Sequence, residues 1–311
     1  MKPILTVCFV LFMMISPIQA QHQDAPNTST SSHSAPPTWT TENVINFRLN
    51  QHNNMVVKVL LNEVDECEFM FHTAVDSVSV VSTSTANLKS VQFTHEANTI
   101  SWGGNQKSRL SIANKIQIGS QTWSDVSITE DHFSGIGTDG KFGWGLFEGK
   151  VVEIDFDRQQ LRLHSKQPDV TGYDRFETKY QRGGMTLACQ IGIGDDVVSH
   201  HFLMHSGFSG TALFDDDFTM KHHLHRQWQA SAGRELKDSL GNVINTTKVN
   251  VPSLTLGSVT LRDLSAELFP GDIGSQKQSV LGGEILKRFN MIVDTQQGQV
   301  FLKPNRNNHA E

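Results

Sequence analysis

The sequence lacks long apolar runs and any excess of basic charge. Its longest apolar run, Ile4–Ile15, is too short to cross a bilayer, and no other segment is long and apolar enough to do so. Lys and Arg number 26 against 32 Asp and Glu, which gives a net charge of −6, and the basic residues form no stripe. We therefore expect no membrane span and no nucleic acid partner.

Cysteine is also scarce, with three residues in the chain. Cys8 lies inside the N-terminal apolar run, so only Cys67 and Cys189 belong to the rest of the sequence. These two lie far apart and share no metal-binding or redox spacing. They could pair in an oxidising compartment, or they could be two partly buried small hydrophobic side chains. The sequence leaves both possibilities open.

The N-terminal segment has the features of a targeting sequence. A short basic start precedes Ile4–Ile15, and the small residues of Ser16–Ala20 follow it, which predicts a secretory signal peptide over residues 1–20. Residues 21–43 are rich in Ser, Thr and Pro and are expected to form a disordered leader. The protein is therefore expected to be secreted or periplasmic.

The remaining chain has the pattern of an all-β protein. Runs rich in β-branched residues, or alternating between apolar and polar residues, are separated by turn signals. Helical periodicity is limited to two short segments, Asp216–Trp228 and Gly283–Arg288. The predicted strands include Val56–Leu61, Val78–Val81, Lys115–Ile118, Val151–Phe156 and Leu161–Leu163.

An internal repeat organises these elements. An apolar strand leads into a polar triplet at His72-Thr73-Ala74, and a second strand leads into His205-Ser206-Gly207. In both halves a Gly-terminated strand, an apolar turn containing glycine and a final hairpin follow in the same order. This shared order predicts two homologous lobes, 44–166 and 178–305.

The repeat resembles the pepsin and retropepsin superfamily of aspartic proteases, and in particular the bacterial secreted type with two retropepsin-like lobes. The second half carries the resemblance best, through Phe202–Thr211 and Val280–Phe289. The resemblance implies an all-β, bilobal fold in which two β-barrel-like lobes flank a central cleft. It also implies that an extended peptide or partner protein binds in that cleft.

The resemblance places the catalytic aspartates of the family at the first residue of each triplet, where this chain has His72 and His205. It places the hydroxyls that brace the two loops at Thr73 and Ser206, with Gly207 keeping the family glycine and Ala74 departing from it. It also places Trp102 in a flap hairpin that contacts a bound peptide.

Four hypotheses follow for the histidine pair. The favoured one is a catalytically degenerate protease fold that binds a peptide and needs no cofactor. A second is a zinc site, which would need a third ligand in addition to His72 and His205. A third is an active hydrolase that uses the imidazoles as acid and base. A fourth is a shifted alignment that brings an aspartate such as Asp76 into the site. Candidate third zinc ligands are Asp76, His132, His200 and His201.

Three further polar groups have simpler interpretations. We expect Asp294 to lie in the turn of a final hairpin, and Asp215 to lie at the start of a helix, where carboxylates are favoured. His222 and His225 would share a helical face, which is more typical of a solvated surface than of a metal site.

Overall fold

The structure, a computed structural model, describes residues 44–101, 104–181, 183–269 and 278–308. These residues belong to one compact unit, 39–311, and they form an all-β architecture with a few short helices. The fold class expected from the sequence is thereby confirmed. The predicted signal peptide, the leader and Trp102 lie outside the described residues.

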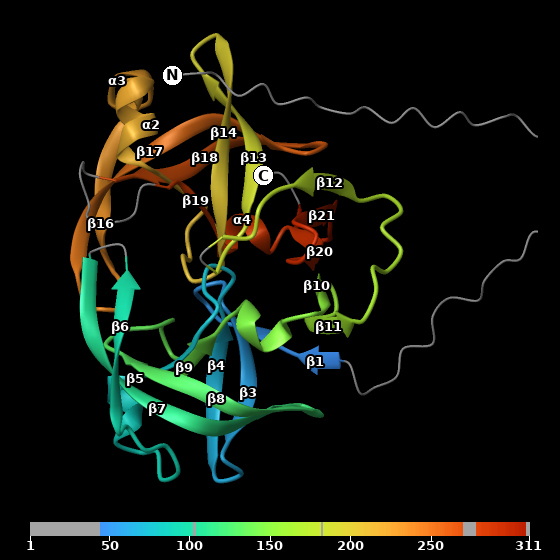
Figure 1. The fold of residues 1–311 in the computed structure, drawn as a ribbon. Helices are drawn as coiled ribbons and strands as arrows, with labels where there is room; N and C mark the ends of the chain where they lie inside the picture. The colour runs from blue at the N-terminus through green and yellow to red at the C-terminus, as the bar shows by residue number, and fades with distance from the viewer. Residues whose placement is uncertain (1–43, 102–103, 182, 270–277, 309–311) are drawn as a thin grey trace, which may run out of the picture. The chain divides into compact units, whose positions relative to one another are not determined.

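The first half of the chain forms a closed β-barrel. Its strands are hydrogen-bonded in the order β2-β3-β4-β9-β5-β8-β7-β6, and a further pairing of β3 with β7 closes a ring of six strands. We call this the first barrel (Figure 1). Its elements are β2 (Arg48–Leu49), β3 (Met55–Leu61), β4 (Asp65–Phe71), β5 (Val78–Val81), α1 (Ser82–Thr85), β6 (His95–Ser101), β7 (Gly104–Ile118), β8 (Gln121–Asp131), β9 (Gly140–Phe142) and the 3-10 helix η2 (Trp144–Phe147).

The second half forms a matching barrel. Its strand order is β13-β14-β19-β15-β18-β17-β16, and a pairing of β13 with β17 closes the ring. We call this the second barrel. Its elements are β13 (Thr186–Ile193), β14 (Asp196–His205), β15 (Ala212–Phe214), α2 (Asp216–Lys221), α3 (Leu224–Gln227), β16 (Ala230–Lys237), β17 (Val243–Leu256), β18 (Val259–Leu268), β19 (Val280–Gly282) and α4 (Gly283–Leu286).

The two barrels repeat one topology strand for strand. In the first, β4 runs parallel to β9, β9 antiparallel to β5, and β5 parallel to β8. In the second, β14, β19, β15 and β18 follow the same sequence of parallel and antiparallel pairings. The repeat inferred from the sequence order therefore corresponds to a repeat of the backbone.

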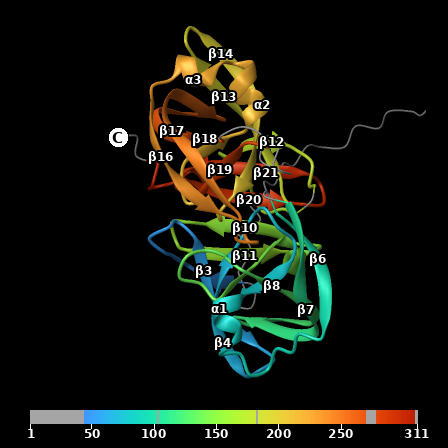
Figure 2. The same cartoon turned by 90° about the vertical axis from the view of Figure 1, so that its left-hand side faces the viewer.

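A third sheet contains the final hairpins of both halves. The sequence pattern predicts these hairpins but not that they share a sheet. Its order is β1-β11-β10-β20-β21-β12, and the hydrogen bonds between β10 and β20 connect the two halves of the chain (Figure 2). Val152 faces Val293 and Ile154 faces Met291 in this pairing, and all four side chains are buried. The sheet consists of β1 (Val44–Asn46), β10 (Val151–Asp155), β11 (Gln160–His164), β12 (Asp174–Glu177), β20 (Phe289–Asp294) and β21 (Gln299–Pro304).

The structure resolves the minor expectations as well. Cys67 and Cys189 are free, buried thiols, so the disulfide does not form. Asp215 caps α2 by accepting a hydrogen bond from the Phe218 amide at 2.8 Å, as its position before a helix led us to expect. Among the described residues, no helix is long and apolar enough to span a membrane.

The shared helical face of His222 and His225 is a wrong expectation. Helix α2 ends at Lys221, and His223 adopts a left-handed backbone with φ 51° before α3 begins at Leu224. The chain turns between the two histidines, so they do not lie on one helix.

Candidate functional site

The first loop of the site follows β4 directly. The His72 amide donates to the Phe142 carbonyl on β9 at 2.9 Å, and the Trp144 indole donates to the Thr73 carbonyl at 2.9 Å. Behind the loop, Phe71 packs against Phe142 and Trp144, with ring centroids 5.3 and 5.0 Å apart. The aromatic core of the first barrel therefore holds the His72 loop at the end of its strand.

The second loop follows β14 in the same way. The Phe208 amide closes a turn by donating to the His205 carbonyl at 3.0 Å, and the Gly283 amide donates to the Phe208 carbonyl at 2.7 Å. The neighbouring Gly282 must lack a side chain, because a Cβ there would overlap the Gly210 carbonyl oxygen. The close crossing of these segments fixes where the His205 ring begins.

Thr73 and Ser206 bind the two loops to each other. The Thr73 hydroxyl donates to the Met204 carbonyl at 2.9 Å and accepts from the Ser206 amide at 3.0 Å. The Ser206 hydroxyl donates to the Phe71 carbonyl at 2.8 Å and accepts from the Thr73 amide at 3.0 Å. Both side chains are buried, so these four bonds form a reciprocal bridge between the barrels, shielded from water.

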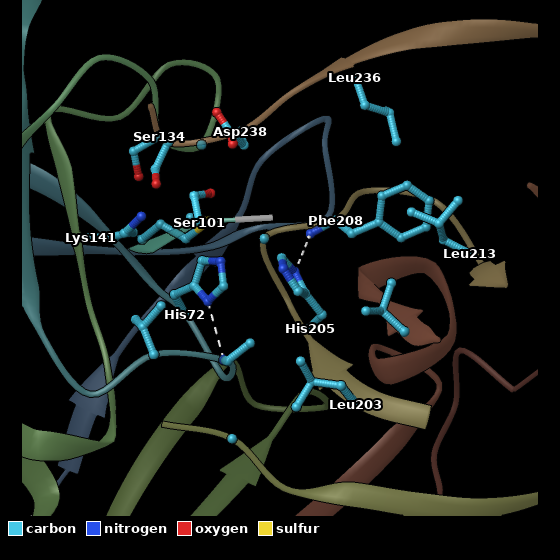
Figure 3. Close-up of a pocket in the computed structure, with 18 of the residues that line it drawn as sticks. His72, Ser101, Ser134, Lys141, Leu203, His205, Phe208, Leu213, Leu236 and Asp238 are labelled. Carbon is cyan, nitrogen blue, oxygen red and sulfur yellow. Dashed lines mark hydrogen bonds between the residues drawn. The ribbon is translucent and has the colours of Figure 1, made fainter. Parts of the chain in front are cut away.

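The bridge brings His72 and His205 together. Their ring centroids lie 4.6 Å apart with an interplanar angle of 66°, and Figure 3 shows the two rings next to each other among residues that line a cavity. His72 is buried, and His205 is partly buried. Gly207 leaves room for the pair, because a Cβ at this position would overlap His72 Nε2. The two predicted residues thus share one centre.

Backbone hydrogen bonds fix how each ring is protonated. The Ala74 amide donates to His72 Nδ1 at 3.1 Å, and the Phe208 amide donates to His205 Nδ1 at 3.0 Å. Because Nδ1 accepts in both rings, the proton of each neutral imidazole resides on Nε2. Within the described residues no hydrogen bond reaches either Nε2, so both N–H groups are available to a ligand.

The surroundings keep both imidazoles neutral. Burial lowers the pKa of His72 well below its usual range, and the Coulombic cost of charging both His72 and His205, together with the ammonium of Lys141, lowers it further. Burial, together with Lys141, lowers the pKa of His205 to about 4. At neutral pH the centre therefore consists of two uncharged N–H donors.

A buried ion pair lies beside the histidines in the first barrel. Lys141 Nζ contacts Asp131 Oδ2 at 2.8 Å, and the Ser79 hydroxyl donates to the same oxygen at 2.6 Å. Lys141 on β9 pairs with Met70, which lies two residues before His72. Strand alternation therefore directs the side chains of Lys141 and His72 to the same face of the barrel wall. Lys141 is not among the site residues expected from the sequence, although the repeat aligns it with an apolar residue, Val280, in the second half.

The second barrel has apolar residues at the same three places. Val280 on β19 pairs with Leu203, two residues before His205, and with Leu213 on β15. Lys141 on β9 makes the corresponding pairs with Met70 and Ser79 in the first barrel. Phe269, the residue just after β18, corresponds in the repeat to Asp131, the last residue of β8. With Phe208 these residues form a separate hydrophobic cluster, which we call the apolar pocket; its members are Phe208, Leu213, Phe269 and Val280.

A cavity of about 1290 Å³ contains the whole centre. Both the ion pair and the apolar pocket line it, as do the hairpins β6–β7 and β16–β17 through Ile100 and Leu236. In Figure 3, Lys141 and Ser134 lie on the His72 side, and Phe208, with Leu213 and Leu236, lies on the His205 side. The two sides of the cavity thus differ in chemistry.

The other candidates from the sequence lie elsewhere. Asp76 is exposed and does not line the cavity, which contradicts the shifted alignment. His200 contacts Asp215 and Ser279 at 3.1 and 2.9 Å, away from the pair, and His132 is exposed. His201 lines the cavity.

The zinc hypothesis lacks its third ligand in the part of the chain that the structure describes. There, no three His, Cys, Asp or Glu side chains gather around a point where an ion could sit. A pair of imidazoles is an incomplete ligand set for zinc.

The fold has a solved counterpart. The chain superimposes on the aspartic proteinase from Irpex lacteus with a TM-score of 0.58 and 12% sequence identity, covering 86% of this chain and 98% of that one. No family model and no curated protein sequence matches the chain. The similarity supports the bilobal aspartic protease fold.

Proposed function

We propose that this protein is a catalytically degenerate, aspartic-protease-like protein that holds an extended peptide in the cavity between its barrels without cleaving it. The apolar start of the sequence supports a secreted or periplasmic location. The proposal accounts for a protease fold whose two loops remain bridged while the groups at the centre are imidazoles.

The observation that carries the proposal is the acceptance of a backbone hydrogen bond by Nδ1 in both rings. Aspartic protease chemistry uses two carboxyl groups that share one proton, so that one acts as base and the other as acid. Neutral His72 and His205 present two donors to the cavity and no acceptor. Such a pair has no free lone pair with which to take a proton from water.

The strand order supports an extended ligand. Strands β6 and β16 are the edge strands of their sheets, and each lies in a hairpin that lines the cavity. An edge strand offers unpaired backbone groups, to which a peptide can add as a further strand. Ile100 on β6 lines the cavity although its side chain is 70% exposed, which suits it to contact a bound apolar side chain.

Fluorescent peptides of extended sequence test this function against the purified full-length chain. We expect saturable binding and no cleavage between pH 4 and pH 7. Ile100→Glu should weaken binding several-fold, whereas Ile112→Glu should not, because Ile112 is an exposed isoleucine of β7 outside the cavity lining. Cleavage by the wild-type protein that disappears in His205→Ala would contradict the proposal.

A further inference from the structure

We infer that the centre receives a carboxylate of the bound peptide, held by His72, His205 and Lys141, while the apolar pocket receives a neighbouring apolar side chain. This inference rests on the proposed function and adds to it the chemical class of the ligand. The family's aspartate dyad is acidic, so the present centre has the opposite preference: it offers hydrogen-bond donors and a cation to the ligand.

Hydrogen-bond donors of His72, His205 and Lys141 converge on the centre. Each histidine ring presents one Nε2–H, because its Nδ1 accepts a backbone hydrogen bond. Lys141 carries three N–H donors, and its contact with Asp131 engages the ammonium on one side. A carboxylate has two oxygens with about four lone-pair sites, which suits two imidazole donors and an ammonium better than a single carbonyl does.

The cavity wall on the Lys141 side contains a buried hydroxyl, that of Ser134, without a partner among the described residues. Ser134 Oγ makes no hydrogen bond within the described residues, although it is buried and lines the cavity. It lies on the same side of the cavity as Lys141 in Figure 3. An unsatisfied buried hydroxyl carries a free-energy cost, which a ligand oxygen bound at this wall would remove.

Two acidic groups that line the cavity, Asp131 and Asp238, have partners of their own. Asp131 Oδ2 accepts from Ser79 and contacts Lys141, so this oxygen has two partners within the first barrel. Asp238, on the loop after β16, accepts from the Leu240 and Asn242 amides at 3.0 and 2.8 Å. Glu235 lines the cavity on β16, where Arg234 and Lys237 also line it. In the described part of the chain, neither Asp131 nor Asp238 engages the Nε2–H groups of the two histidines.

The two walls of the cavity differ in chemistry on either side of the centre. The apolar pocket occupies the positions that hold the ion pair and Ser79 in the first barrel. A ligand that spans the centre therefore meets a charged wall on one side and an apolar wall on the other. A peptide with an apolar residue beside a carboxylate matches both walls. Its terminal carboxylate or an acidic side chain can supply the anion.

Three probes of one extended peptide ending in leucine separate these sources. The first has a free C-terminus, the second a C-terminal amide, and the third is the amide with glutamate beside the leucine. We expect the free acid or the glutamate peptide to bind about tenfold or more tightly than the plain amide, and the one that does so identifies the source of the carboxylate.

A pair of variants assigns the preference to the centre. Lys141→Gln with Asp131→Asn replaces the ion pair by a neutral pair of similar size, and it should abolish the preference for the carboxylate, so that the free acid and the glutamate peptide no longer bind more tightly than the amide. The matched control, Val280→Gln, should weaken all three probes alike because it changes only the apolar wall. Thermal unfolding of both variants verifies that they fold.

Equal affinity for all three probes would overturn the inference and leave peptide binding intact. Retention of the carboxylate preference in the Lys141→Gln/Asp131→Asn variant would also overturn the assigned role of Lys141. Failure of every probe to bind would overturn the proposed function together with the inference.

Discussion

The two barrels share a backbone but differ in what they present to the cavity. The first barrel buries Lys141, Asp131 and Ser79 where the second buries Val280, Phe269 and Leu213. Since the second barrel closes through the same strand pairings without a charge at these places, the fold does not require the ion pair. A buried ion pair gives little net stability, because the loss of hydration offsets the attraction. Its presence in only one barrel therefore points to a role in ligand binding.

Replacing part of the ion pair should have the largest effect on stability. Lys141→Met leaves Asp131 buried without its cation, which we expect to cost about 3–5 kcal/mol of unfolding free energy. Converting all three positions to their second-barrel counterparts, Ser79→Leu, Asp131→Phe and Lys141→Val, should cost much less. Urea denaturation measures both. A triple variant as unstable as Lys141→Met would show that the barrels are not interchangeable at these positions.

The bridge between the loops tests where the barrels are alike. Thr73→Val and Ser206→Ala each remove one hydroxyl and leave one amide and one carbonyl without that partner in a buried site. We expect each to cost about 2 kcal/mol of unfolding free energy, with similar values for the two. Denaturation of the single and double variants measures this. A large cost for one and none for the other would contradict the reciprocal bridge.

The sequence predicts the repeated parts of this molecule well and the parts specific to one half poorly. The order of elements around the His72 and His205 triplets predicts two homologous lobes, and the resemblance to aspartic proteases implies the barrels and the shared centre. The pairing of β10 with β20 could not be predicted, because two final hairpins with apolar faces carry no information on which strands meet or in what register. The Lys141 contrast was visible in the repeat, as a lysine aligned with a valine.

The protonation of the pair could not be predicted from residue types. Histidine offers donors or acceptors according to its tautomer, and the tautomer here depends on the backbone amides of Ala74 and Phe208. Those amides reach Nδ1 only because each loop turns immediately after its histidine. The backbone therefore decides whether the centre donates or accepts hydrogen bonds.

The matched histidines should make stability depend on pH. In the unfolded chain imidazoles titrate near pKa 6.5, whereas the pKa of His205 in the folded protein is about 4 and that of His72 is also well below its usual range. Between pH 6.5 and pH 4 the unfolded state binds more protons, so the free energy of unfolding falls as pH falls. We expect a loss on the order of 3 kcal/mol from His205 alone over this window, and a further loss from His72.

Comparison with the His72→Gln/His205→Gln variant isolates that contribution, because glutamine does not titrate and keeps an N–H donor. Other groups that titrate in this window, such as His222, contribute equally to both proteins, so the difference in slope belongs to the pair. The free energy of unfolding, measured by denaturation between pH 4 and pH 7, should change more steeply with pH in the wild type than in the variant. Equal slopes would mean that the imidazoles are protonated alike in the folded and unfolded states, and the centre would then carry charge below about pH 6.5. Since the charged form of either ring would also attract a carboxylate, equal slopes would revise the description of the donors while leaving the contrast between the two walls of the cavity in place.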